Sequence, residues 1–250
     1  MDVPGPQVFW MSAWDRWLPL HFNVLLVEGH GIKLLVNTGP PDDLEPLNRH
    51  VRSMLGERAC FARGAEETVL AHLGRVGLEP DEITHVVVTP FTLYSTSGIP
   101  LFPNAEICLS RRGWLAFHTT HDHPHDARWA TFSKETLRYL VVDAWDRVRL
   151  LEDEDVIAPG IRTWWAGAHH RASIAVEIDT PAGVAIASDA FFYRENVIDD
   201  HPLGIGESLD QALACYARVR QTADHILPLT DPTLLDLYPG GVVANPAPTR

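Results

Sequence analysis

The stretch IRTWWAGAHHRASIAVEIDTPAGVAIASDA, residues 161–190, carries the pattern that decides the fold. β-Branched and aromatic residues are concentrated in three short runs of this stretch, and turn-forming residues separate the runs. We therefore predict strands over residues 161–166, 173–179 and 183–187. The sequence Gly167-Ala168-His169 lies in the first connection, and Asp189 follows the third strand. An imidazole and a carboxylate thus lie in the connections of a strand-rich region.

The rest of the chain extends this pattern in both directions. Upstream, two β-rich runs joined by a turn at residues 28–31 predict a hairpin, and downstream Ser208 and Gln211 have the spacing of a capping box that begins a helix. The other predicted strands cover residues 20–27, 32–36, 83–89, 105–110 and 225–228, and the predicted helices cover residues 66–76, 134–144 and 208–223. Two strand-rich halves with outer helices favour an α/β fold, a four-layer αββα sandwich of sheets covered by helices.

Composition and charge limit the class of protein. A chain of 250 residues with 46% hydrophobic residues can bury a substantial core, and we expect one domain over residues 1–250 with a disordered tail at 241–250. The formal net charge of -13 is unfavourable for binding to nucleic acid or to a membrane of anionic lipid, so neither is an expected partner. No apolar run is long enough to span a bilayer, no signal peptide is evident, and the 3 cysteines are far apart. These features predict a soluble cytoplasmic protein whose partner is a small-molecule substrate or ligand.

Three tryptophans near the N-terminus, Trp10, Trp14 and Trp17, recur at helical spacing. Aromatic side chains at this spacing are typical of a helix face buried in the core or in a homodimer contact, although they could also line a hydrophobic cleft. We therefore expect core packing or a homodimer contact for this segment.

Three segments together resemble the metallo-β-lactamase superfamily, in particular its lactonase-like branch of N-acyl homoserine lactonase-like proteins. Residues 83–112 are similar to the strand, metal loop and following strand of that branch. Residues 167–190 are similar to its glycine–histidine turn and bridging-aspartate strand, and residues 226–232 to the segment that carries its last histidine. The resemblance covers roughly residues 20–240 and implies the αββα sandwich of that superfamily.

The chain departs from the family at the metal ligands. Where the family has H-x-H-x-D-H followed much later by a last histidine, this sequence has Pro90, Thr92, Tyr94, Ser95 and Thr230. Asn37 replaces the aspartate that usually supports the metal loop, and only His169 and Asp189 keep ligand-type side chains. Zinc needs three or four imidazole, thiolate or carboxylate ligands, and neutral hydroxyls bind metals poorly. We therefore expect no dinuclear zinc site and no metal cofactor.

The resemblance brings His169 and Asp189 together, and we expect them to act as an acid and base pair. Tyr94 is expected to be a third catalytic residue, which protonates a leaving group or holds an oxyanion. Four polar side chains are expected to bind the substrate: Thr92, Ser95, His170 and Thr230. The predicted function is a metal-independent enzyme that carries out hydrolysis or elimination on a small ester, lactone or other carbonyl metabolite. The alternative for each hydroxyl is a structural role, in which it satisfies backbone groups around the former metal site.

Two other functions are open. The protein could bind a small ligand without turnover, as a non-catalytic or regulatory protein, since one fold hosts many functions. It could also be a weak mononuclear metallohydrolase in which His169, Asp189 and a histidine from residues 118–126 hold one ion. That segment contains His118, His121, Asp122, His123, His125 and Asp126. The turn-forming residues there favour a surface loop, and the spacing matches no zinc signature.

Overall fold

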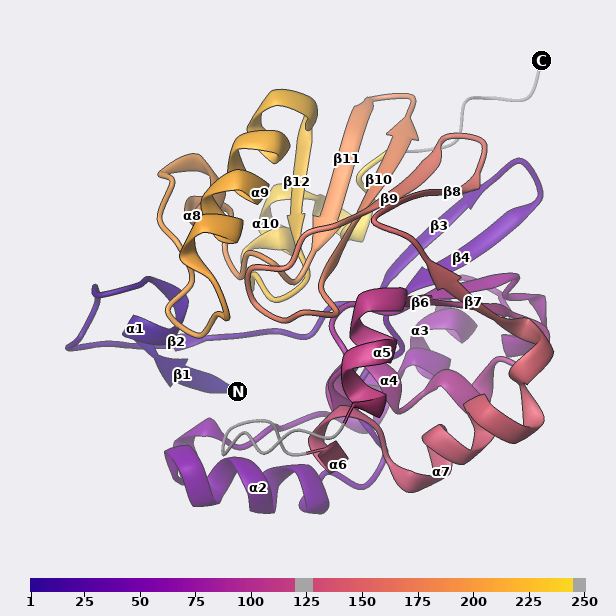
Figure 1. The fold of residues 1–250 in the computed structure, drawn as a ribbon, viewed down its shortest axis with the longest axis horizontal. Coiled ribbons are helices and arrows are strands. Elements are labelled where there is room, and N and C mark those ends of the chain that lie inside the picture. Colours follow the sequence, from indigo (N-terminus) through magenta and orange to yellow (C-terminus); the bar gives the residue numbers. More distant parts are fainter. Residues whose placement is uncertain (120–127, 245–250) are drawn as a thin grey trace. The chain divides into compact units, whose positions relative to one another are not determined.

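A computed structural model of the chain describes residues 1–119 and 128–244. The chain divides into two compact units. The first comprises Met1 and residues 22–151, and the second comprises residues 2–21 and 152–250 (Figure 1). Most of the predicted tail, residues 245–250, lies outside the described part of the chain. The single domain predicted from the sequence stays a prediction, and each unit is described by itself below.

The first unit is built on a five-stranded sheet with the order β3-β4-β5-β6-β7. Its strands are β3 (Leu25–Gly29), β4 (Ile32–Val36), β5 (His85–Val87), β6 (Glu106–Ser110) and β7 (Val148–Leu151). β3 and β4 are antiparallel, whereas β4 to β7 are parallel. The predicted hairpin is present, and His30 and Gly31 at its tip have φ of 51° and 78°, as a two-residue hairpin turn requires. The first strand begins at Leu25 rather than at residue 20, because residues 20 and 21 belong to the second unit.

Short helices accompany this sheet. The α-helices are α2 (Glu45–Leu55), α3 (Val69–Arg75), α4 (Leu93–Thr96), α5 (Arg111–His118), α6 (Arg128–Thr131) and α7 (Lys134–Arg138). The helix predicted over residues 66–76 begins only at Val69, because the Thr68 hydroxyl accepts a hydrogen bond from the Ala71 amide and caps the helix there. The helix predicted over residues 134–144 is α-helical to Arg138 and continues as a π-helix, Tyr139–Asp143.

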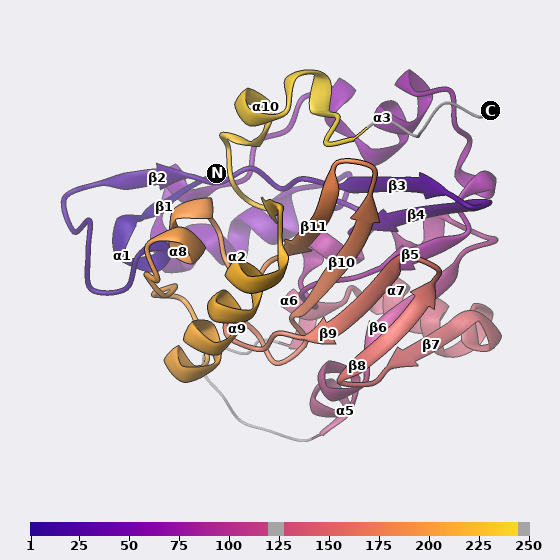
Figure 2. The same ribbon diagram turned by 90° about the horizontal axis from the view of Figure 1, so that it is seen from above.

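The second unit is built on another five-stranded sheet, with the order β12-β11-β10-β9-β8 (Figure 1), of which Figure 2 labels β8 to β11. Its strands are β8 (Glu154–Ala158), β9 (Ile161–Trp165), β10 (Ile174–Thr180), β11 (Gly183–Ser188) and β12 (His225–Pro228). β11 and β12 are parallel, and the other neighbours are antiparallel. The predictions for residues 161–190 and 225–228 are confirmed to within a residue at each end.

Two helices of this unit, α8 (Arg194–Ile198) and α9 (Leu209–Thr222), pack with the sheet around a buried core that includes Trp164, Ile186 and Tyr216. The Ser208 hydroxyl accepts from the Gln211 amide and caps α9, as the sequence predicts. The Gln211 side chain does not complete the predicted capping box: its amide oxygen accepts a hydrogen bond from the backbone of Ala168.

The N-terminal segment forms a ribbon of β1 (Asp2–Pro4) and β2 (Trp17–Pro19), with the single-turn helix α1 (Gly5–Val8) between them. Residues 9–16 are not helical, and Trp10 and Trp14 are 47% and 70% exposed. The prediction that these tryptophans form a helix face buried in the core is therefore wrong. The helical spacing is misleading here because Met11 and Ala13 adopt positive φ and interrupt any helix.

The second unit ends with the short helix α10 (Leu234–Leu237) and a 3-10 turn, Pro239–Gly241. Over residues 1–119 and 128–244, no helix is both long and apolar enough to cross a membrane.

Candidate active site

Three connections of the second unit meet at one edge of its sheet. β11 and β12 are parallel, so their carboxyl ends lie at the same edge, where ligand-binding loops of such sheets commonly gather. The Ser188 hydroxyl donates to the Ile174 carbonyl at 2.9 Å and brings the start of β10 to this edge. We call residues 166–173 the histidine turn, residues 189–193 the aspartate loop and residues 229–233 the threonine loop.

The histidine turn has an unusual backbone. Gly167 and Ala168 have φ of 57° and 62°, in the left-handed region. A Cβ atom on Gly167 would lie 2.4 Å from Gln211 Oε1, so only glycine fits there without rearrangement. Ala168 is held on both sides, because its amide donates to Gln211 Oε1 at 3.1 Å and its carbonyl accepts from the Glu207 amide at 2.7 Å. The first turn of α9 and the residues before it therefore fix the backbone that carries His169.

The orientation of His169 is set by one hydrogen bond to the backbone. Its Nδ1 lies 2.6 Å from the Ile205 carbonyl oxygen. A carbonyl only accepts, so Nδ1 carries the proton and donates, and in the neutral form of the ring the lone pair lies on Nε2. The ring is half-buried and packs edge-on against Phe192, with 4.9 Å between centroids. His169 is therefore presented in the tautomer that can accept a proton at Nε2.

Asp189 is buried, at 2% exposure, and the Ser173 hydroxyl donates a hydrogen bond to its Oδ2. The same hydroxyl oxygen accepts from the His170 amide at 3.2 Å, so Ser173 connects the aspartate loop to the histidine turn. Burial, followed by the nearby charge of Asp189, raises the pKa of the Cys215 thiol to about 12. The predicted acid and base pairing of His169 with Asp189 stays a prediction, since the Nδ1 of His169 is engaged by Ile205.

Two residues predicted to bind substrate lie in the same unit. The Thr230 side chain is buried, and its hydroxyl donates to the Phe192 carbonyl at 3.1 Å. His170 is half-buried, and its Nδ1 accepts from the Ala172 amide at 3.0 Å. Each side chain therefore satisfies a backbone group, which favours the structural alternative for the Thr230 hydroxyl.

The remaining predicted site residues lie in the first unit, in and before α4. Thr92 Oγ1 lies 3.4 Å from Ser95 Oγ, and Ser95 is fully buried. The Tyr94 ring is half-buried and packs against Phe22 and Phe61, with centroids 4.5 and 6.1 Å apart. Whether these side chains act together with His169 stays a prediction.

Asn37 follows β4 of the first unit and adopts φ of 67°. Its side-chain amide spans the backbone of Thr89, donating to the carbonyl and accepting from the amide, both at 2.8 Å. An asparagine amide can make both bonds at once, whereas an ionised aspartate could make only the second. This residue therefore holds the strand end that precedes Pro90 through neutral hydrogen bonds.

Comparisons with known proteins address the fold. No family model matches the chain. The N-acyl homoserine lactonase of Bacillus cereus is 21% identical over 199 residues, which cover 78% of this chain and 74% of that protein. The solved structure of an N-acyl homoserine lactone hydrolase, with the product N-hexanoyl-L-homoserine bound at its catalytic metal centre, has a TM-score of 0.74 at 18% identity. The match covers 94% of this chain and 91% of that one.

The chain has a lactonase-like metallo-β-lactamase fold. This confirms the predicted fold class, the αββα sandwich type. A more distant structure with the same likeness is AidC, a dizinc quorum-quenching lactonase, with a TM-score of 0.61 at 15% identity over 94% of this chain and 79% of that one.

The loss of the zinc ligands stays a prediction, and the structure shows the surroundings of the side chains that it concerns. Pro90 has no donor atom, the Thr92 and Ser95 hydroxyls are hydrogen-bonding neighbours, and the Thr230 hydroxyl is bonded to a carbonyl. Among residues 1–119 and 128–244, no group of three or more His, Cys, Asp or Glu side chains is arranged to hold a metal ion. Whether the chain holds a dinuclear centre stays a prediction.

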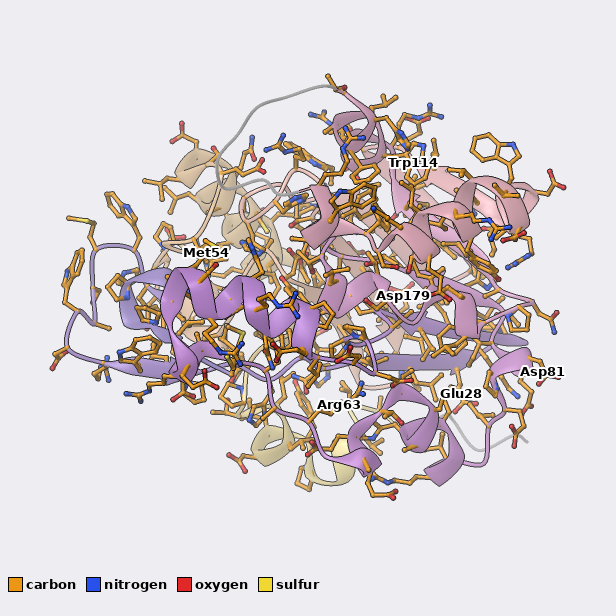
Figure 3. All side chains as sticks on the ribbon, turned by 90° about the horizontal axis from the view of Figure 1, so that it is seen from below. Glu28, Met54, Arg63, Asp81, Trp114 and Asp179 are labelled. Carbon is orange, nitrogen blue, oxygen red and sulfur yellow. The ribbon has the colours of Figure 1, made fainter. Side chains whose placement is uncertain are left out.

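The histidine-rich segment of the alternative mononuclear site is described only in part. His121, Asp122, His123, His125 and Asp126 lie outside the residues that the structure describes. His118 ends α5, and its ring packs edge-on against Trp114, which Figure 3 labels, with 4.5 Å between centroids. Burial, together with the charge of Arg128, lowers the pKa of His118.

The sequence interpretation missed three residues that organise the histidine turn: Ser173, Ile205 and Gln211. Ser173 is the first residue of a predicted strand, and the antiparallel register of β10 and β11 places that strand start beside the residues after β11. A sequence pattern does not fix strand register, so nothing in the sequence indicates the contact between Ser173 and Asp189. Ile205 acts through its carbonyl, which any residue type could supply.

Proposed function

We propose that the protein hydrolyses a small lactone or ester without a metal ion, and that His169 is its general base. The observation that carries this proposal is the hydrogen bond from His169 Nδ1 to the Ile205 carbonyl, which leaves Nε2 as the proton acceptor. The proposed substrate class is supported by the likeness to N-acyl homoserine lactonases.

The proposed reaction needs only proton transfers and one acyl exchange. Nε2 of His169 takes a proton from a water molecule while the water oxygen bonds to the carbonyl carbon of the substrate. The tetrahedral intermediate then breaks its bond to the ring or ester oxygen, and that oxygen receives the proton from Nε2. The product of a lactone is a hydroxy acid. Tyr94 stays proposed as a catalytic proton donor and Asp189 as the acid and base partner of His169. Four polar side chains stay proposed as substrate-binding groups: Thr92, Ser95, His170 and Thr230.

A second candidate function is binding of a small ligand without turnover. The Thr230 hydroxyl favours it, because its bond to the Phe192 carbonyl leaves this hydroxyl less able to donate to a developing oxyanion. Turnover by the wild-type protein separates the two functions.

Replacing His169 tests the proposal. We expect His169→Ala to lower the rate of lactone or ester hydrolysis by about 10²-fold to 10⁴-fold, the usual contribution of a general base. His201→Ala is the matched control, since His201 Nε2 also bonds to a backbone carbonyl, that of Trp10 at 2.9 Å, in the same unit. The measurement is a screen of N-acyl homoserine lactones, other lactones and aryl esters, with and without a chelator.

The expected result is activity that survives chelation, is lost in His169→Ala and is retained in His201→Ala, with similar melting temperatures. Equal turnover in wild type and His169→Ala, or loss of turnover on chelation, would remove the proposal. Tight ligand binding without turnover in wild type would establish the binding function instead.

A further inference from the structure

We propose that Ser173 is a positioning residue, which ties the Asp189 carboxylate to the histidine turn and thereby holds His169 in its Nδ1–H tautomer. The inference rests on the proposed function in assigning a use to that tautomer. It concerns a residue that matches none of the ligand positions of the fold family and that makes its contacts through a hydroxyl group.

The side chain of Ser173 makes contacts on both sides. Its hydroxyl donates to Asp189 Oδ2 in the aspartate loop and accepts from the His170 amide in the histidine turn. Ser173 is fully buried, so these bonds are shielded from competition with bulk water. A carboxylate buried at 2% exposure is stabilised by each donor that points to it, and the serine hydroxyl is such a donor.

The backbone of Ser173 closes the histidine turn. Its amide donates to the His170 carbonyl at 2.8 Å, and its carbonyl accepts from the Ala166 and Gly167 amides at 3.0 and 3.1 Å. Residues on both sides of His169 are therefore bonded to Ser173. A shift of Ser173 toward or away from Asp189 moves the turn, and with it the imidazole that reaches the Ile205 carbonyl.

Hydrogen bonds from neighbouring groups can orient the side chains of a site. In this chain the ordering is done by a neutral hydroxyl donor. Removal of that donor takes one hydrogen bond from the Asp189 carboxylate within a packed interior, and we expect the carboxylate to rotate and the histidine turn to move with it.

The test compares the wild type with Ser173→Ala in the substrate-free protein. Nitrogen-15 NMR distinguishes an imidazole protonated at Nδ1 from one protonated at Nε2, and His169→Gln identifies the signal. We expect one Nδ1–H tautomer in the wild type and a mixture of tautomers in Ser173→Ala. With a turned-over substrate, we expect kcat to fall roughly 10-fold to 100-fold with little change in KM.

Two further variants separate positioning from general stability. Ser110→Ala removes another buried serine hydroxyl, 2% exposed, which caps α5 by accepting from the Gly113 amide. It should lower the melting temperature without changing the His169 signal. Ser173→Thr keeps the hydroxyl and should restore the single tautomer. If Ser173→Ala does not fold, Asp189→Asn removes the charge that Ser173 holds and gives the same NMR comparison.

A wild-type tautomer in Ser173→Ala, or in Asp189→Asn where the serine variant does not fold, would overturn the positioning role. A tautomer mixture in Ser173→Ala with the single tautomer kept in Ser110→Ala supports the role even if no lactone or ester is hydrolysed. In that last case the proposed hydrolysis fails while the positioning role stands, so the two proposals fail separately.

Discussion

At the scale of single residues, the geometry of the candidate site depends on Gly167. Its φ of 57° places it in the left-handed region, and a Cβ there would lie 2.4 Å from Gln211 Oε1 and 2.8 Å from the Trp165 ring. We expect Gly167→Ala to lower the free energy of unfolding by about 1–3 kcal/mol, because the added methyl meets both strain and close contacts. Urea unfolding followed by circular dichroism measures the change.

The control for Gly167→Ala is Gly74→Ala. Gly74 is an exposed residue of α3, where an added Cβ has nothing within 4 Å. Alanine there should raise the free energy of unfolding by about 0.5–1 kcal/mol, since it reduces the freedom of the unfolded chain and has the higher helix propensity. Equal effects of the two substitutions would show that the histidine turn relaxes around a side chain.

At this scale the sequence identified His169 and Asp189 but not what orients them. The two residue types follow from the resemblance to the lactonase-like branch, since they are read directly along the chain. Their orienting partners cannot be read in this way, because Ile205 contributes a backbone carbonyl and Ser173 contributes a contact that depends on strand register. The structural role of Thr230 is likewise visible only in the structure, where its hydroxyl donates to the Phe192 carbonyl.

At the scale of elements, β5 carries a half-buried histidine that is followed by two buried valines. His85 lies opposite Glu106 of β6 in the parallel register, and its Nδ1 lies 2.8 Å from the Thr84 hydroxyl. Burial is the main cause that lowers the pKa of His85; Arg149 acts in the same direction and Glu106 opposes it. The folded state therefore binds a proton at His85 less readily than the unfolded chain does.

This difference gives the sign of a pH dependence. Near pH 6 the unfolded chain binds more protons at this position, so the contribution of His85 to stability is present above its unfolded pKa of about 6.5 and is lost as the pH falls below it. We expect the free energy of unfolding to fall between pH 7 and pH 5, and His85→Gln to reduce that slope. His50→Gln, at an exposed position of α2, is the control and should leave the slope unchanged. An unchanged slope in His85→Gln would contradict the assignment.

The elements themselves were largely predictable where periodicity and turn chemistry agree. β12 matches its predicted bounds, and the β3–β4 hairpin follows from the His30-Gly31 turn. Helix ends were predicted less accurately, because the Thr68 cap and the π-helical continuation after Arg138 depend on local hydrogen bonds. The tryptophans at helical spacing show the limit of periodicity, since a backbone with positive φ at Met11 and Ala13 forms no helix.

At the scale of the whole molecule, the question is whether the protein carries a metal ion. The resemblance to the lactonase-like branch implies that only His169 and Asp189 keep ligand-type side chains, and the Thr92, Ser95 and Thr230 side chains provide no charged donor. We expect protein purified without an affinity tag to contain well under one equivalent of zinc, iron or manganese by inductively coupled plasma mass spectrometry. As a control, protein is dialysed against chelator and then against zinc, which measures how much zinc it can bind.

Stoichiometric metal that resists mild chelation would contradict this expectation and would favour the mononuclear alternative. Substitution of His121 and His123 would then show whether the histidine-rich segment supplies the missing ligands.

The overall fold class was predictable from two strand-rich halves and from three separated segments of resemblance. The division of the chain between units was not, because it depends on which distant segments pair.

The second unit has one further consequence, for the order in which the chain is assembled. Residues 2–21 belong to this unit, yet residues 22–151 separate them from the rest of it. The His21 amide donates to the Thr230 carbonyl, and the Gln7 carbonyl accepts from Gly204 and Ile205. During synthesis these first residues leave the ribosome without their partners, and the first unit can form locally in the meantime. The contacts of residues 2–21 with residues 204, 205 and 230 therefore span almost the entire chain and can form only after the carboxyl-terminal part of the unit has been made.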